Sequence, residues 1–182
     1  MKLTKKIIAI VLATLTILST FAFAGCTGNP KAMAVKALKA SFNGDYKTLV
    51  SMINPKLLDE LLEQAEIEKS DLKEIYKEIA EDRKEYNKDE ELKFTKAQVT
   101  KTDEKKNSEV KDYVANYEEY DYIKDLDLDV KDVMECTVKY YWKEDGDSEH
   151  EKDTMTFMKV GGKWYLGFSE SMRIISTLRS YK

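Results

Sequence analysis

The chain has 182 residues, of which 35% are charged, and it carries a formal net charge of −4 with only two cysteines. Residues 1–25 contain three lysines and no acidic residue, so the other 157 residues carry 27 basic and 34 acidic side chains, a net charge of −7. This acidic balance, with no run of Lys or Arg interleaved with aromatic residues, argues against a nucleic acid as partner. A length of 157 residues is sufficient for one domain with its own core.

The N-terminal segment has the three-part pattern of an export signal. A basic cluster at 2–6 precedes an uncharged run over 7–23, and the small residues Ala24 and Gly25 then precede Cys26. The four residues 23–26, Phe-Ala-Gly-Cys, resemble the lipobox of bacterial lipoproteins. The resemblance implies a signal peptide over 1–25, cleavage between Gly25 and Cys26, and a lipid on Cys26 that attaches the protein to the outer side of the cell membrane. Residues 26–30 would then be a short tether.

Two other interpretations of this segment stay open. Residues 22–24, Ala-Phe-Ala, also fit the small-x-small site of ordinary signal peptidase, which would release a secreted protein. The uncharged run alternatively approaches the length of a membrane-spanning helix. If Cys26 is lipidated, two acyl chains give a stable attachment, and the charge of −7 adds no electrostatic attraction to an anionic membrane. Cys136 would then lack a disulfide partner, and its alternation with Met134 and Val138 predicts a buried strand position.

The first half of the mature chain, about 31–87, is predicted to be helical. Asn29-Pro30 and Asn54-Pro55 each place a capping side chain before a proline at the first helical position. Helices are expected over about 30–42, from 46 to about 53, after Pro55 and from a Ser70 cap to Asn87. The helix after Pro55 shows an apolar stripe typical of one buried face, formed by Leu57, Leu58, Leu61, Leu62 and Ala65.

The second half, about 92–168, is predicted to be mainly β. A strand over 92–101 with a bulge near Lys96 precedes a polar loop at 103–107. Residues 110–120 fit a helix better than a strand, although Tyr and Val also favour strands. Alternating aspartates at 125–132 resemble a calcium loop, but the Gly and Glu that an EF-hand needs are absent, so no metal site is predicted.

Three strands are expected at the end of the β part, over 133–143, 148–160 and 163–168, joined by Asp145-Gly146 and Gly161-Gly162 turns. Two-residue loops would pair Met158 with Tyr165, Phe157 with Leu166 and Met155 with Phe168. They would also set Met134 beside Phe157, Cys136 beside Met155 and Lys139 against Lys152. Because two lysines repel, a three-residue loop with a bulge stays an alternative. A helix over about 170–181 completes the predicted domain of residues 31–182.

The last hairpin is apolar on both sides, which favours cover on both faces. The face that carries Tyr165 and Met158 either lines a cavity or belongs to the core. Gly161-Gly162-Lys163-Trp164-Tyr165-Leu166, after a helical segment with Asn43-Gly44-Asp45-Tyr46 and a lipobox, is similar to small Gram-positive lipoproteins with a cystatin-like or nuclear-transport-factor-2-like domain. This resemblance implies an α+β cone, with N-terminal helices packed on a curved antiparallel sheet. No catalytic motif of those families maps onto this chain.

Few chemistries are compatible with the residues present. His150 is the only histidine, which excludes zinc sites built from several histidines, and there is no glycine-rich phosphate loop. We therefore predict no catalytic residue, metal ligand or cofactor. The expected function is a lipid-anchored extracytoplasmic binding or accessory module for a small ligand or an envelope protein or polymer. A small pocket enzyme that uses Asp, Glu and Tyr, and a structural interaction protein, are the alternatives.

Overall fold

The structure is a computed structural model that describes residues 28–182. The predicted signal peptide, the cleavage site after Gly25 and the lipid-attachment residue Cys26 lie outside the described residues. Within the described part, every helix is too short or too polar to cross a membrane.

The described chain begins with helices, as the sequence predicts: α2 (Pro30–Phe42), α3 (Tyr46–Val50), α4 (Pro55–Gln64) and α5 (Leu72–Asp89). The Asn29 side chain accepts the Lys31 N–H at 2.9 Å, and the Asn54 side chain accepts the Lys56 N–H at 3.0 Å. Both Asn-Pro pairs therefore begin helices, which confirms the predicted starts.

The predicted cap of α5 is wrong. The Ser70 hydroxyl lies 3.2 Å from a Glu68 carboxylate oxygen and 3.1 Å from an Asp71 carboxylate oxygen. In both contacts the Ser70 hydroxyl is the donor to a neighbouring carboxylate, and it accepts no capping N–H. The N-cap position is occupied by Asp71, whose side chain makes no capping hydrogen bond.

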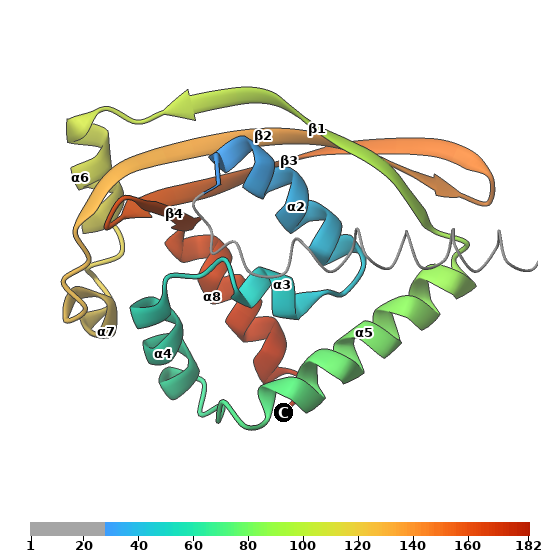
Figure 1. Cartoon of the computed structure of the whole chain (residues 1–182), viewed down its shortest axis with the longest axis horizontal. Helices are drawn as coiled ribbons and strands as arrows, with labels where there is room; N and C mark the ends of the chain where they lie inside the picture. Colours follow the sequence, from blue (N-terminus) through green and yellow to red (C-terminus); the bar gives the residue numbers. More distant parts are fainter. Residues whose placement is uncertain (1–27) are drawn as a thin grey trace, which may run out of the picture.

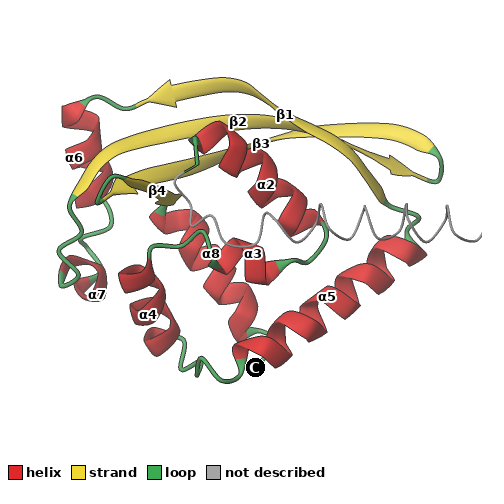
Figure 2. Cartoon of the chain, in the orientation of Figure 1, coloured by secondary structure: helices red, strands yellow, loops and turns green. Residues whose placement is uncertain are grey.

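Four antiparallel strands form one sheet in the order β1-β2-β3-β4. They are β1 (Lys93–Glu104), β2 (Val130–Glu144), β3 (Asp147–Val160) and β4 (Lys163–Leu166). Figure 2 shows the long strands passing over a group of helices, which confirms an α+β architecture.

β1 is longer and more irregular than predicted. Its pairing with β2 runs to Glu104, which includes part of the expected polar loop, and its register shifts near Thr95 and again near Thr100. Only the first shift, near Lys96, was predicted. At both shifts a threonine hydroxyl donates to a β2 carbonyl, Thr95 to Tyr141 at 2.8 Å and Thr100 to Thr137 at 3.2 Å. These bonds give a hydrogen-bond donor to the β2 carbonyl beside each bulge, where the regular pairing of the strands is interrupted.

Both hairpins have two-residue loops. Glu144 pairs with Asp147, and Val160 pairs with Lys163. Asp145 and Gly146 have φ angles of 51° and 88°, the left-handed pair that a tight hairpin turn requires. Of the two registers left open for β2 and β3, the one with a two-residue loop is therefore correct, and Lys139 does lie opposite Lys152.

The end of the sheet differs from the prediction in one respect. β4 ends at Leu166, and α8 (Phe168–Arg179) begins after Gly167, so Phe168 does not pair with Met155. The Phe168 N–H donates to the Tyr113 hydroxyl at 2.9 Å instead of to β3. That hydroxyl belongs to α6 (Asn107–Ala115), which confirms a helix rather than a strand here. The helix ends before the predicted residue 120, and the short α7 (Asp121–Lys124) follows.

The sheet has two unlike faces, because residues that pair across strands share a face and alternate along each strand. One face is covered by α2 and α8, with α3 packed against both helices (Figure 1), and is named the helix-covered face. It carries the buried residues Cys136, Val138, Met155, Phe157 and Leu166. The other face is named the outer face. At one end of it, where α6 packs on β2, Val133 and Met158 are fully buried.

Candidate functional site

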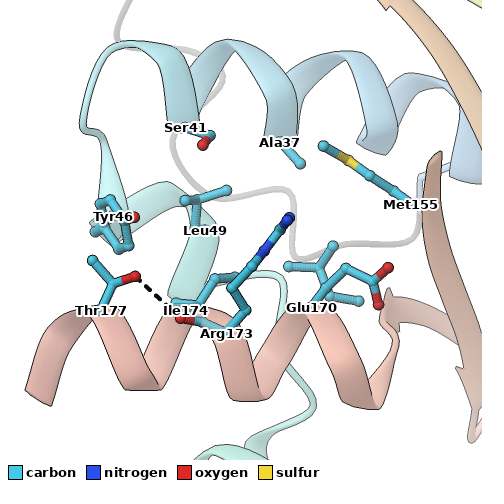
Figure 3. A pocket seen from close by; sticks show the side chains of 10 residues that line it. Ala37, Ser41, Tyr46, Leu49, Met155, Glu170, Arg173, Ile174 and Thr177 are labelled. Carbon is cyan, nitrogen blue, oxygen red and sulfur yellow. Dashed lines mark hydrogen bonds between the residues drawn. The ribbon is translucent and has the colours of Figure 1, made fainter. Parts of the chain in front are cut away.

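A cavity of about 220 Å³ lies between the helix-covered face and three helices. Figure 3 shows α2 and α3 on one side of it and α8 on the other. Its lining residues are Ala37, Ser41, Tyr46, Leu49, Met155, Leu166, Glu170, Arg173, Ile174 and Thr177. The site therefore joins the first helices of the described chain to its last strand and helix.

The inner wall of the cavity is apolar. Ala37, Leu49, Met155, Leu166 and Ile174 are each at most 7% exposed. They come from α2, α3, β3, β4 and α8, so no single element forms this wall. A small apolar group placed there would lose contact with water on several sides, which is the usual source of affinity in such sites.

Arg173 brings a positive charge to the cavity. Its side chain extends from α8 toward α2 in Figure 3, and the residue is exposed to solvent. Within residues 28–182, no ion pair includes Arg173. A guanidinium without a carboxylate partner can bind a carboxylate through two parallel hydrogen bonds.

Glu170 lies one turn before Arg173 on α8. Its Oε1 accepts the Thr156 backbone N–H at 2.8 Å, whereas Oε2 is buried and has no hydrogen-bond partner among the described residues. Burial raises the pKa of this carboxyl, against the smaller lowering effects of the Thr156 N–H, its own backbone N–H and Arg173. Protonation would remove the cost of a buried charge, so the neutral acid is favoured relative to an exposed glutamate.

The surroundings of Glu170 are tightly packed at Gly167. A Cβ added there would lie 2.8 Å from Glu170 Oε2 and 2.6 Å from the Tyr113 hydroxyl oxygen. The Tyr113 hydroxyl accepts the Phe168 N–H, and burial raises its pKa. Tyr113 therefore stays neutral at physiological pH and holds α6 against the start of α8.

The cavity does not lie on the face that carries Tyr165 and Met158. Those two residues pair on the outer face, where Met158 is fully buried and Tyr165 is half-buried. Of the two alternatives for that face, the core is correct for Met158. Sequence reasoning did not find Glu170 or Arg173, because on the sequence they are two ordinary polar residues of an amphipathic helix.

The other residues considered from the sequence have no role in the cavity. Cys136 is fully buried, and burial raises the pKa of its thiol, which confirms the predicted core position. His150 is exposed, with its ring centroid 5.7 Å from that of Tyr141. No group of His, Cys, Asp or Glu within residues 28–182 is arranged to hold a metal ion.

Comparisons with known proteins found no matching family model, no matching curated protein and no matching solved structure.

Proposed function

We propose that this protein is a lipid-anchored extracytoplasmic module that binds a small carboxylate with an apolar body. The domain would be a cone-like α+β unit of the cystatin or nuclear-transport-factor-2 type, with its ligand between the helices and the sheet. The attachment would be a lipid on Cys26, exposed by cleavage after Gly25.

The observation that carries this proposal is the guanidinium of Arg173, which has no ion-pair partner within residues 28–182, beside an apolar wall. The ligand carboxylate would bind Arg173 through a forked pair of hydrogen bonds, and its hydrocarbon part would contact Met155 and Leu166. The raised pKa of Glu170 supports this arrangement, because it lessens the negative charge that would repel an anionic ligand beside Arg173.

The cavity volume restricts the ligand class. Pockets for drug-sized ligands measure roughly 300–1,000 Å³, and this cavity measures about 220 Å³. A nucleotide or a large cofactor would not fit, whereas a short aliphatic acid would.

The test uses hexanoate as probe and the side-chain methyl resonances of Met155 and Leu166 as readout. We expect saturable shifts of both methyl groups in the parent and their loss in Arg173→Gln. Arg179→Gln is the matched control, because Arg179 lies on the same helix but outside the cavity lining. Shifts that persist in Arg173→Gln, or no shifts in the parent at millimolar hexanoate, would refute the proposed binding.

The proposed anchor has its own test. Cys26→Ala should move the protein from the detergent phase to the aqueous phase in a phase-partition experiment, and radiolabelled palmitate should no longer be incorporated. A Cys136→Ala control should keep both properties, because that thiol is buried in the core. Retention of Cys26→Ala in the detergent phase would contradict lipid attachment at this residue.

A small pocket enzyme is the second candidate, favoured by the buried Glu170 carboxyl with its raised pKa. Glu170 would then act as a general acid. Turnover of a small 4-nitrophenyl ester that disappears in Glu170→Gln, while hexanoate still binds, would support this candidate. No observation of similar weight favours a structural interaction protein. Tyr86 and Tyr120 are the only exposed large hydrophobic residues in the described part of the chain.

A further inference from the structure

The outer face of the sheet carries a group of lysines that the strand register brings together. On β1 these are Lys93, Lys96 and Lys101; on β2 and β3, Lys139, Lys143 and Lys152 share the same face. We name these six residues the lysine face. Five of them are exposed and Lys139 is half-buried.

The residues interspersed with the lysine face on the same part of the sheet include no acid. They are Gln98, Thr137, Tyr141, Ser148, His150 and Thr154. The nearest acids on the same face, Asp103 and Glu135, are already bound by Lys105, at 3.2 Å and 3.1 Å. Within residues 28–182, none of the six lysines forms an ion pair.

Tyr141 lies in the middle of these charges. The Nζ atoms of Lys96 and Lys139 lie 4.4 Å and 5.0 Å from the centre of its ring. The aromatic face partly compensates two neighbouring ammonium groups that would otherwise repel each other. The ring therefore helps to hold the two cations together on the surface without neutralising either one.

The opposite side of the same strands has the opposite charge. Glu149, Glu151 and Asp153 alternate with His150 and Lys152 along β3 and project to the helix-covered face. The sheet thus separates a basic surface from an acidic one, although the chain beyond residue 25 has a net charge of −7. Such a local field attracts an anionic partner to one surface only.

Protection of sheet edges does not account for the lysine face. Lysines on edge strands commonly prevent strand pairing between molecules. That explanation fits β1 and also Lys152, which lies outside the part of β3 that pairs with β4, but β2 is an interior strand and supplies Lys139 and Lys143. Moreover, Lys139 lies directly opposite Lys152, an arrangement that destabilises a sheet. A local feature that costs stability without a structural gain is typical of a functional surface.

We propose that the lysine face binds a linear, phosphate-bearing polyanion of the cell envelope. Alternate residues on a strand lie about 7 Å apart and neighbouring strands about 4.8 Å apart, so the ammonium groups form rows along which a chain of phosphates can lie. Lysine binds phosphate as a point charge and needs no fixed orientation, which suits a flexible polymer.

The position of the chain start favours a polymer over the bilayer itself. α2 follows directly after the tether and packs on the helix-covered side of the sheet (Figure 1). A lipid on Cys26 would therefore hold that side toward the membrane and leave the lysine face directed away from it. This choice of partner rests on the proposed anchor, whereas the binding of a polyanion does not.

The test measures binding of long-chain polyphosphate to the full-length chain in non-ionic detergent at several salt concentrations. The variant replaces Lys96, Lys139, Lys143 and Lys152 with Gln. The matched control replaces four exposed lysines of α5 with Gln: Lys73, Lys77, Lys84 and Lys88. The two variants have the same net charge, so only the position of the lysines differs.

We expect the parent and the α5 control to bind polyphosphate with the same steep salt dependence. In the lysine-face variant, the slope of log K against log salt should become shallower by about three, at roughly 0.7 for each phosphate contact. Hexanoate should still shift the Met155 methyl in this variant, which shows that the fold and the cavity are intact. This readout separates a failure of polymer binding from a failure of the proposed cavity ligand.

Several results would overturn the proposal. They are no binding by the parent, an equal loss in the α5 control, or an unchanged slope in the lysine-face variant. Binding to phosphatidylglycerol vesicles but not to free polyphosphate would identify a membrane surface instead. Displacement of polyphosphate by duplex DNA at a lower phosphate concentration would identify a nucleic-acid surface.

Discussion

The Tyr113 hydroxyl accepts the backbone N–H of Phe168 at 2.9 Å and thereby joins α6 to the first turn of α8. The two residues are also in ring contact, with centroids 5.6 Å apart. Gly167 immediately precedes this turn, and it leaves room for both the hydroxyl and the Glu170 carboxyl. The start of α8, and with it the position of Glu170 and Arg173, depends on this contact.

Gly167→Ala should destabilise the fold by about 1–3 kcal/mol, because its Cβ would lie 2.6 Å from the Tyr113 oxygen. Tyr113→Phe should reduce the free energy of unfolding by about 1 kcal/mol, because the hydrogen bond to Phe168 is lost. The double variant should lose less free energy of unfolding than the two single variants together, since removal of the hydroxyl makes room for the new methyl group. Urea denaturation of the four proteins measures this, and strictly additive costs would contradict the packing explanation.

Asn54→Ala should reduce the free energy of unfolding by about 1–2 kcal/mol, because this buried side chain caps α4 through the Lys56 and Leu57 N–H groups. Asn29→Ala is the matched control: it precedes a proline in the same way, but its cap is exposed and bonds only the Lys31 N–H. Thermal denaturation should show the smaller loss for Asn29→Ala. Equal losses of stability in Asn54→Ala and Asn29→Ala would mean that burial of the capping side chain does not strengthen the cap.

Glu170→Gln should change the pH dependence of stability. Burial raises the pKa of Glu170 in the folded state, so the folded protein binds this proton more tightly than the unfolded chain does. The stabilisation from the bound proton is fully present below the unfolded pKa, and it is lost as the pH rises through the folded pKa. Denaturation midpoints from about pH 4 to about pH 8 should fall more for the parent than for Glu170→Gln. A parallel pair of curves would exclude a raised pKa at this position.

Lys152→Glu should stabilise the sheet by about 0.2–1 kcal/mol, because it replaces a like-charge pair opposite Lys139 with an opposite-charge pair. The gain should diminish in high salt, while polyphosphate binding should weaken. Lys152→Gln, which removes repulsion without adding attraction, should lie between the parent and Lys152→Glu in melting temperature. A loss of stability in both variants would show that Lys152 has a structural role.

Cys136 should resist thiol reagents in the native state, because it is fully buried and its pKa is raised by burial. Ellman's reagent added to the native protein should react with Cys136 only at the rate of unfolding, and with the full stoichiometry in denaturant. Rapid reaction under native conditions would mean that the helix-covered face opens readily.

The local structure was predictable wherever neighbouring residues determine it. The Asn-Pro helix starts and the two-residue turn at Gly161-Gly162 follow from backbone preferences that act over a few residues. At Asp145-Gly146 the sequence left a two-residue and a three-residue loop open, and the structure has the two-residue loop. The end of β4 was not predictable in this way. Phe168 lies outside the sheet, and its N–H binds a hydroxyl 55 residues away, a contact that no local pattern indicates.

What the sequence alone determined is the order and type of most elements, the core position of Cys136 and an expected anchor at Cys26. The tertiary structure alone decided which side chains come together. Arg173 meets Met155 and Leu166 only after α8 folds back on the sheet, and the six lysines share a surface only in the paired register of three strands. The net charge of −7 beyond residue 25 gives no indication of this basic surface, because alternation along β3 places its acids and Lys152 on opposite faces of the sheet.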